Sequence, residues 1–363
     1  MENRIRIKDI AAKAGVSKGT VDRVLHNRGN VSSTAKDKVL AAMKELHYQP
    51  NLIASALASK KSWRFAVLQP DDEQDPFWSQ PKAGVIKAKQ LVRDYRANID
   101  FFHFRDADAP HFVELANQIV KAKYDGVLVS PSFSKEGHTV LQQFEEHHIP
   151  YVQFNTALNR ESDYSLTYIG QNSYASGKLA AKLLDFGIGE GEGAWVLHLE
   201  QEVYNAQHLV DKENGFRDFF KQKNRQNINI HFSSFGDVFN KEGLTEHLKK
   251  TLKNYPKIRG IFVTTSKVFH IVPILEELGR TDIKLVGFDL IENNLNWLYK
   301  DRIHFLINQN PQKQGFIGIM TLFNALVLKK EIKPLQLLPL DVVMKENVQY
   351  YLEEDQEQLQ VVL

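Results

Sequence analysis

Basic and hydroxyl side chains are concentrated between residues 17 and 27 of the sequence. Lys18 and Arg23 can donate hydrogen bonds to the guanine acceptors of a DNA major groove. Neighbouring side chains could contact phosphates, and these are Ser17, Thr20, His26 and Asn27. Residues 1–64 hold thirteen lysines and arginines against five acidic residues, whereas the remainder holds 33 against 39. This asymmetry favours a polyanionic partner for the basic segment, the alternative being an unevenly charged, solvated surface.

A second set of polar and aromatic residues stands directly after apolar runs of the later sequence. Asp75, Phe77 and Trp78 follow one run, and four polar residues end or follow others, namely Asn155, Thr265, Asp289 and Gln309. Aromatic rings pack on the apolar face of a sugar, and carboxylates accept strong hydrogen bonds. These residue types at strand ends therefore predict a site for a small polar ligand. The alternative for Phe77 and Trp78 is a purely structural role in the core and at a helix start.

The basic segment has the pattern of three short helices. Apolar spacing predicts helices over 7–14, 18–26 and 33–47, with a turn at Gly15 and N-caps at Ser17 and Ser32. Two short helices joined by a glycine turn and braced by a third predict a helix-turn-helix. Residues 50–60 indicate a linker in which Asn51 caps a helix too short to be stable alone.

Beyond residue 63, strand and helix patterns alternate. Strands are predicted over 63–69, 97–104, 125–131, 149–155, 194–200, 228–233, 259–265, 284–289 and 303–308. Helices are predicted near 78–94, 110–122, 136–147, 173–186, 205–223, 241–253, 268–278, 291–299 and 312–329. This alternation indicates parallel sheets covered by helices, and the length favours two lobes. Because α/β sheets bind ligands at the carboxyl ends of their strands, we expect a ligand in the cleft between the lobes.

Two segments, at 7–32 and 38–62, resemble the headpiece and hinge of the lactose-repressor (LacI) family of transcription regulators, namely IKDIAAKAGVSKGTVDRVLHNRGNVS and KVLAAMKELHYQPNLIASALASKKS. The resemblance implies that Lys18 and Gly19 occupy the two main base-reading positions and Arg23 a third. Gly19 departs from the family pattern because it has no side chain to read a base. The resemblance also implies that Leu57 wedges into a central base step with Ala54 beside it in the minor groove. The alternative for Leu57 is an ordinary linker residue.

Residues 63–345 resemble the type I periplasmic sugar-binding fold, the ribose-binding-like body of the same family, most specifically in KLVGFD and NQNPQKQG. The resemblance implies that Phe77 and Trp78 stack on a sugar, that Asp289 accepts two hydroxyls and that Gln309 lies at the hinge side. Lys212 aligns with an arginine that grips ligand hydroxyls. Three sites depart from the sugar-binding pattern, namely Lys212, Thr265 and the pair Asn155-Thr156, so the ligand's identity stays open.

The sequence gives no support to an enzyme, a cofactor or a metal site. It has no cysteine, which excludes thiolate catalysis and Cys-ligated metals. The run GIGEGEG at 187–193 has the wrong glycine register for a dinucleotide site and lies between a helix and a strand. We expect the cluster Glu145-Glu146-His147-His148, at a helix end, to be a solvated face.

These inferences combine into one prediction of organisation and function. The domains predicted are a headpiece over 1–49, a hinge over 50–62, a two-lobed effector and dimerisation domain over 63–345, and a tail over 346–363. We expect a cytoplasmic homodimer that binds a palindromic operator and responds to a sugar-like effector. Two alternatives remain. One is a solute-binding protein of sugar uptake, which the charged N-terminus and the headpiece disfavour. The other is an architectural DNA-binding protein with a vestigial cleft.

Overall fold

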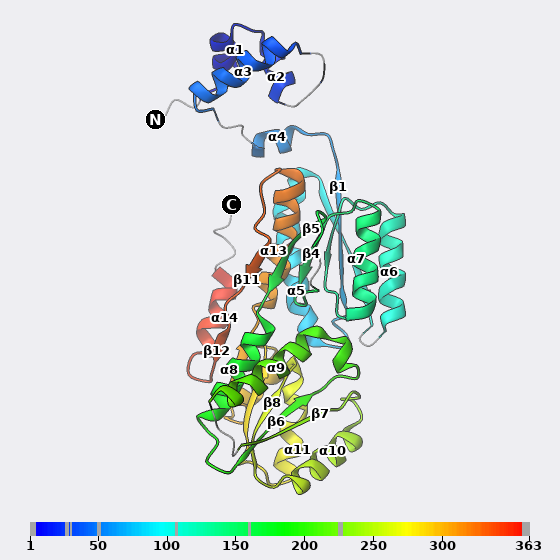
Figure 1. Cartoon of the computed structure of the whole chain (residues 1–363), viewed down its shortest axis with the longest axis vertical. Helices are drawn as coiled ribbons and strands as arrows, with labels where there is room; N and C mark the ends of the chain where they lie inside the picture. Colours follow the sequence, from blue (N-terminus) through cyan, green and yellow to red (C-terminus); the bar gives the residue numbers. More distant parts are fainter. Residues whose placement is uncertain are drawn as a thin grey trace. The chain divides into compact units, whose positions relative to one another are not determined.

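The computed structural model describes residues 5–25, 29, 31–48, 52–105, 108–158, 161–223 and 228–357. The chain divides into two compact units, Met1–Lys60 and Lys61–Leu363. Figure 1 shows the helical first unit and the α/β second unit. Within the part of the chain that the structure describes, no helix combines the length and the apolar character that a membrane span requires.

The first unit is a small helical domain with its own core. Its helices are α1 (Ile7–Ala14), α2 (Lys18–Leu25), α3 (Ser33–Glu45) and α4 (Leu52–Ala58). The first three surround a core built from Ile10, Ala11, Ala14, Val21, Val39 and Ala42. Gly15 ends α1 with φ at +65°, a left-handed conformation that glycine adopts without a steric penalty. Leu40 is 47% exposed, because the inward face of α3 is set by Val39, Ala42 and Met43.

The N-lobe of the second unit contains a fully parallel sheet in the order β11-β5-β4-β3-β1-β2. Its strands are β1 (Trp63–Pro70), β2 (Ala97–Phe104), β3 (Gly126–Val129), β4 (Tyr151–Phe154), β5 (Ser165–Gly170) and β11 (Leu335–Leu337). Helices α6 (Ala109–Lys121) and α7 (Ser134–Glu146) share a core with one face of the sheet. Helix α13 (Pro311–Leu322) packs on β3, β4 and β5, and α5 (Ser79–Val92) packs against α13.

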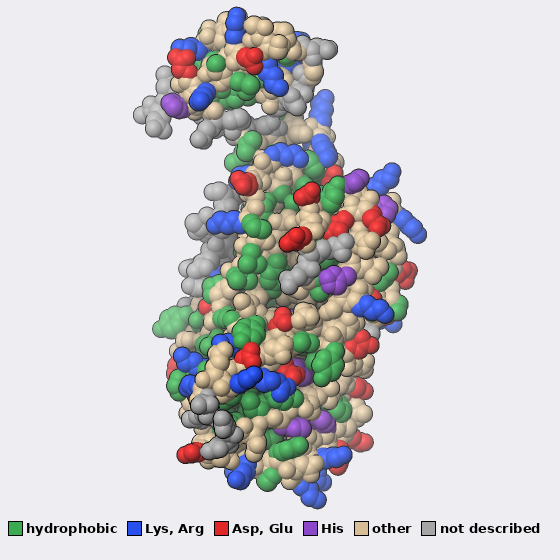
Figure 2. Space-filling model, viewed as in Figure 1, with side chains coloured by type: hydrophobic (Ala, Val, Ile, Leu, Met, Phe, Trp, Pro, Cys, Tyr) green, Lys and Arg blue, Asp and Glu red, His purple; other side chains and the backbone are tan. Residues whose placement is uncertain are grey.

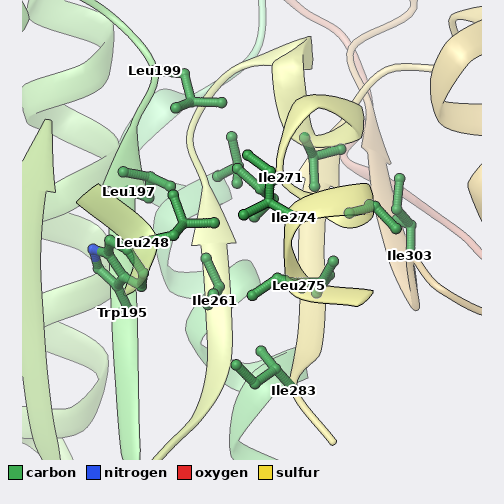
Figure 3. Close-up of a cluster of buried hydrophobic side chains, with 14 of the residues drawn as sticks. Trp195, Leu197, Leu199, Leu248, Ile261, Ile271, Ile274, Leu275, Ile283 and Ile303 are labelled. Carbon is green, nitrogen blue, oxygen red and sulfur yellow. The ribbon is translucent and has the colours of Figure 1, made fainter. Parts of the chain in front are cut away.

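The C-lobe repeats this plan around a sheet in the order β12-β10-β9-β8-β6-β7. Its strands are β6 (Gly193–His198), β7 (Asn229–Ser234), β8 (Ile258–Val263), β9 (Lys284–Phe288), β10 (Phe305–Asn308) and the antiparallel β12 (Asp341–Val343). Helices α8 (Ser173–Asp185) and α9 (Gln207–Gln222) cover one face. The other face packs against α10 (Lys241–Asn254), α11 (Val272–Glu277) and α12 (Glu292–Leu298), with the apolar contacts shown in Figure 3.

The chain crosses between the lobes three times, after β5, after β10 and between β11 and β12. One side chain joins the three crossings. The Gln171 amide nitrogen, at the first crossing, donates to the Asn308 carbonyl at 2.7 Å and to the Pro339 carbonyl at 2.6 Å. Gln171 is buried, so these bonds are shielded from water. The crossings therefore form one hydrogen-bonded hinge.

Glycines let the covering helices approach one another closely. A Cβ atom at Gly177 of α8 would lie 1.9 Å from the carbonyl oxygen of Lys212 in α9. A Cβ atom at Gly84 of α5 would lie 1.9 Å from the carbonyl oxygen of Gln312 in α13. The Gly177 contact brings α8 against the backbone that carries Lys212.

The predicted fold class is confirmed, with local differences. Strands β5, β11 and β12 were not predicted from the sequence. The predicted helix at 268–278 is a 3-10 turn, η4 (Ser266–His270), followed by α11, because Pro273 starts a new helix. The predicted helix at 312–329 ends as α13 at Leu322 and continues as a π-helical turn over Phe323–Val327. Beyond residue 345, Val348 of α14 (Val348–Glu357) is buried in the C-lobe core. The boundaries of the four predicted domains stay predictions.

Candidate functional site

Helix α2 presents a polar, solvent-facing surface in the first unit. Lys18, Gly19 and Arg23 are exposed, whereas Val21 on the opposite face is buried. The Ser17 hydroxyl caps the helix, since it accepts a hydrogen bond from the Thr20 amide at 3.1 Å and lies 3.0 Å from the Thr20 hydroxyl. The surface is therefore held in place by its own cap, and it carries cationic donors suited to the major groove.

The structure does not describe all of the residues that were predicted to contact DNA. His26, Asn27 and Asn51 lie outside the described residues, as does the side chain of Ala54. Leu57 lies on α4 and is 50% exposed, so its apolar side chain faces solvent. Leu52 and Ile53 on the same helix are exposed as well.

A cleft between the two lobes gathers all eight residues that were predicted to bind a ligand: Asp75, Phe77, Trp78, Asn155, Lys212, Thr265, Asp289 and Gln309. They converge because β1, β4, β8, β9 and β10 all end at this edge of their sheets. The hollow has a volume of about 880 Å³, part of it open to solvent. The rule that ligands bind beyond the carboxyl ends of parallel strands thus locates the cleft.

A buried lysine and a buried aspartate, Lys212 and Asp289, form the floor of the cleft on the C-lobe side. The Lys212 ammonium donates to the Thr264 carbonyl at 2.9 Å and lies 3.7 Å from the centre of the Phe288 ring. Burial is the main cause that raises the pKa of Asp289 and lowers the pKa of Lys212, and the attraction between the two charges opposes both shifts. The pair supplies one acceptor and one donor within a site that is largely shielded from water.

The Asp289 carboxylate is oriented by Gln309. The Gln309 backbone N–H donates to one carboxylate oxygen at 3.1 Å, and its side-chain amide donates to the other at 2.7 Å. Asp289 itself has φ at +65°, an uncommon conformation for a residue other than glycine. Asn155, at the end of β4, has φ at +62°. Left-handed backbone at these two positions marks constrained strand ends that face the cleft.

An aromatic wall closes the N-lobe side. Phe77 and Trp78 are 5% and 7% exposed, and their rings meet edge to face with centroids 5.0 Å apart. Trp78 also meets Phe154 edge to face at 6.0 Å. Asp75 precedes this pair and caps its 3-10 turn, because its carboxylate accepts from the Phe77 amide at 3.0 Å. The rings therefore have structural contacts and also line the cleft.

The cleft contains residues that sequence reasoning missed. Lys267 places its ammonium 3.4 Å from a Glu200 oxygen and 3.9 Å from an Asp75 oxygen, which links the lobes electrostatically. Glu200 follows β6, so the strand-end rule that selected Asp289 could have found it. Thr265, which was predicted as a ligand contact, also accepts the Lys267 amide at 3.4 Å and so caps the turn.

Direct hydrogen bonds join the lobes on the far rim of the cleft. Asn205 accepts from the Lys135 amide at 3.0 Å and donates to Glu136 at 3.1 Å. The Gln207 amide donates to the Ser134 hydroxyl at 3.2 Å. Behind this rim, His208 lies 3.3 Å from the Thr156 hydroxyl, and burial, assisted by the charges of Lys212 and His198, lowers its pKa to about 3. His208 is therefore neutral at neutral pH.

The cluster at 145–148 has local partners. The Tyr151 hydroxyl donates to Glu145 at 2.8 Å, and His147 lies 2.9 Å from the Gln143 carbonyl.

Among the described residues, no group of three or more candidate ligands is placed to hold a metal ion. Figure 2 shows positive and negative side chains interspersed over the visible face of the second unit.

Two family models match the chain, one over each unit. Residues 6–51 match the model described as bacterial regulatory proteins, lacI family. Residues 65–331, most of the chain, match the model of a periplasmic binding protein domain.

Known proteins resemble the chain over most of its length. The ribose operon repressor of Halalkalibacterium halodurans is 28% identical over 289 residues, which is 78% of this chain and 80% of the relative. A crystal structure from Bacteroides fragilis, of a protein proposed to be a LacI transcriptional regulator, is 26% identical with a TM-score of 0.73. It covers 80% of this chain and 100% of that one. The glucose-galactose binding protein GanP of Geobacillus stearothermophilus shares the fold, with 19% identity, a TM-score of 0.69, and coverage of 80% of this chain and 99% of that one.

Proposed function

Because the chain belongs to the lacI family of bacterial regulatory proteins and carries a periplasmic binding protein domain, we propose that it is a homodimeric repressor controlled by a sugar-like effector. This membership, together with the likeness to a ribose operon repressor, supports a DNA-binding transcriptional repressor rather than an enzyme. The finer proposal is that it binds a near-palindromic operator, in the cytoplasm, and that the effector occupies the interlobe cleft. One observation carries it: a single chain combines an exposed cationic recognition helix with a polar, aromatic-walled cleft.

The cleft supports a sugar-like effector by its chemistry. Asp289 and Lys212 supply a buried acceptor and donor, and Asn155 adds an amide at the same hollow. Phe77 and Trp78 supply aromatic surface that can pack on the C–H face of a sugar ring. Lobes joined by three crossings can then respond to a ligand that contacts both sides of the cleft. A coupling of about 1–3 kcal/mol between ligand and DNA is typical of such responses.

The DNA side of the proposal concerns α2 and α4. We propose that Lys18 and Arg23 contact base edges in the major groove, with Ser17 and Thr20 at the phosphates. Gly19 would occupy a base-reading position without a side chain to read a base. Helix α4 has seven residues, too few for stability alone in water, so we propose that operator DNA stabilises it. Leu57 would then enter the minor groove, where an apolar wedge unstacks one base step.

Exposed apolar residues support the homodimer. Leu335 and Leu337 lie on β11, an edge strand of the N-lobe sheet, and are 53% and 48% exposed. An edge strand with outward leucines favours association with another chain. We expect light scattering to give the mass of a dimer, and a double change of these leucines to Asp to give that of a monomer.

A selection experiment tests the repressor proposal. The full chain is used to enrich duplexes from a random library, and binding of the enriched duplex is then titrated with and without a panel of sugars. We expect an inverted repeat to be enriched and at least one sugar to change its affinity. Enrichment of no sequence would contradict operator recognition, and an affinity that no sugar changes would contradict the effector class.

A matched pair of variants examines the proposed reader. We expect Lys18→Ala to weaken binding to the enriched duplex by about 10- to 100-fold while affecting random DNA less, as for a base contact. Lys44→Ala, on the exposed face of α3, serves as the control. Equal losses on both duplexes would make Lys18 a phosphate contact.

A further inference from the structure

We propose that the cleft continues into an aromatic subsite on the C-lobe, around Phe239, Phe269 and His270, which binds a second sugar ring. The effector would then be a disaccharide or a longer glycoside. This inference rests on the proposed function, in which a sugar-like molecule occupies the cleft.

The subsite is continuous with the cleft. A second hollow shares four lining residues with it, namely Asp75, Glu200, Gln201 and Lys267. Three of these shared residues form a charged boundary between the hollows, with the Lys267 ammonium 3.4 Å from Glu200 and 3.9 Å from Asp75. Charged side chains at such a boundary could hydrogen-bond to the glycosidic oxygen and to hydroxyls of both rings.

Three rings give the subsite its apolar surface. Phe239, after β7, is 74% exposed, and its ring meets that of His270 at 85° with centroids 6.1 Å apart. His270 in turn lies against Phe269, with centroids 4.1 Å apart. Burial lowers the pKa of His270 to about 4, so its imidazole is uncharged at neutral pH. A large exposed ring that meets a second ring, itself packed on a third, is a surface that gains from being covered by a sugar face.

Polar residues around these rings can form hydrogen bonds with the hydroxyls of the second sugar ring. Gln74 comes from the N-lobe, and Asn293 and Asp237 come from the C-lobe. Amide side chains both donate and accept hydrogen bonds, and a carboxylate accepts them. Sugar hydroxyls also donate and accept, so these residue types are suited to a hydroxylated ring. Because the hollow is lined from both lobes, a second ring there would contact both sides of the cleft, as the first ring does.

Calorimetry with matched sugars tests the subsite. The full chain is titrated with glucose, galactose and fructose, and with maltose, cellobiose, trehalose, lactose, melibiose and sucrose. We expect at least one disaccharide to bind 10-fold or more tightly than either of its component monosaccharides. Phe239→Ala should remove that advantage and leave monosaccharide affinity unchanged. Phe186→Ala, equally exposed at 76% but lining neither hollow, should change neither affinity.

The outcomes separate this inference from the proposed function. If monosaccharides bind and no disaccharide binds more tightly, the subsite is wrong and the sugar cleft stands. If Phe239→Ala lowers both affinities equally, or neither, the second ring does not lie on Phe239. If no sugar binds, the effector class and the subsite are both wrong. A Phe239 surface that instead binds a protein partner would leave every sugar affinity unchanged in the variant.

Discussion

Gln309 donates two hydrogen bonds to the Asp289 carboxylate, one from its backbone and one from its side chain. Each carboxylate oxygen can accept a further hydrogen bond, so the carboxylate is fixed in orientation and still able to receive ligand hydroxyls. Pre-orientation of this kind lowers the entropic cost of binding. Gln309 lies next to the hinge, which makes the Asp289–Gln309 pair a direct link between the cleft floor and the interlobe crossing.

Replacing Asp289 should abolish the response to effector and spare DNA binding. We expect Asp289→Ala to weaken effector binding by about 100-fold, because hydrogen bonds to charged groups contribute about 1.5–3 kcal/mol each. Calorimetry measures the effector, and fluorescence anisotropy measures the operator. Asp185→Asn is the control, since Asp185 is also buried in the C-lobe but pairs with Lys223 outside the cleft. A normal effector affinity in Asp289→Ala would place the pocket elsewhere.

Shortening Leu57 should affect operator DNA alone. A smaller wedge compensates less of the unstacking cost, so we expect Leu57→Ala to weaken operator binding by about 10-fold. Effector affinity should be unchanged. Leu52→Ala, also exposed on α4, is the matched variant for anisotropy titrations. Equal operator affinity for Leu57→Ala and the parent protein would assign Leu57 to the linker.

Adding one methyl group at Gly177 should destabilise the second unit and disturb the cleft. The new carbon would overlap the Lys212 carbonyl, and overpacking of this kind costs typically about 1–3 kcal/mol. We expect a lower midpoint in thermal unfolding and a weaker effector affinity for Gly177→Ala. Lys182→Ala, on the exposed side of α8, should alter neither. A parent-like midpoint for Gly177→Ala would show that the α8–α9 contact relaxes freely.

Stability should fall as the pH drops below the ordinary histidine range, in part because of His208. Its pKa is lowered from 6.5 to about 3 in the folded protein, so between these values the unfolded chain binds more protons. The free energy of unfolding therefore rises with pH across this window. From pH 7 to pH 5 the loss due to His208 would be up to about 2 kcal/mol. Chemical denaturation of His208→Gln should show a correspondingly flatter profile, and parallel profiles would contradict the burial of a neutral imidazole.

The sequence predicted the cleft well because strand ends carry a local signal. Asp289 and Gln309 each follow a clear apolar run, so their convergence follows from the parallel-sheet rule alone. Lys212 lies within a helix and was identified only through the family resemblance. Phe239 and Lys267 were missed because their roles depend on which loops meet across the lobes, which no local pattern encodes.

The fold was predictable for the same reason. The features that were not predicted from the sequence were missed for physical reasons. Strand β11 is three residues long at a sheet edge, with two exposed leucines, so it lacks the buried run that marks β1 or β6. The role of Gln171 was missed because the local sequence around a polar residue does not indicate which distant residues it will hydrogen-bond to. Its partners, at Asn308 and Pro339, are 137 and 168 residues away.

The order of strands also constrains how this chain is made. The N-lobe sheet includes β11, which follows every C-lobe element except β12 and α14. During synthesis from the N-terminus, β1 to β5 therefore emerge long before their sixth strand, and neither sheet is complete until residues 335–343 have left the ribosome. The first unit has its own core and can fold at the start of translation. A nascent regulator of this kind would thus hold a finished DNA-binding unit while its effector-sensing body still waits for its last edge strands.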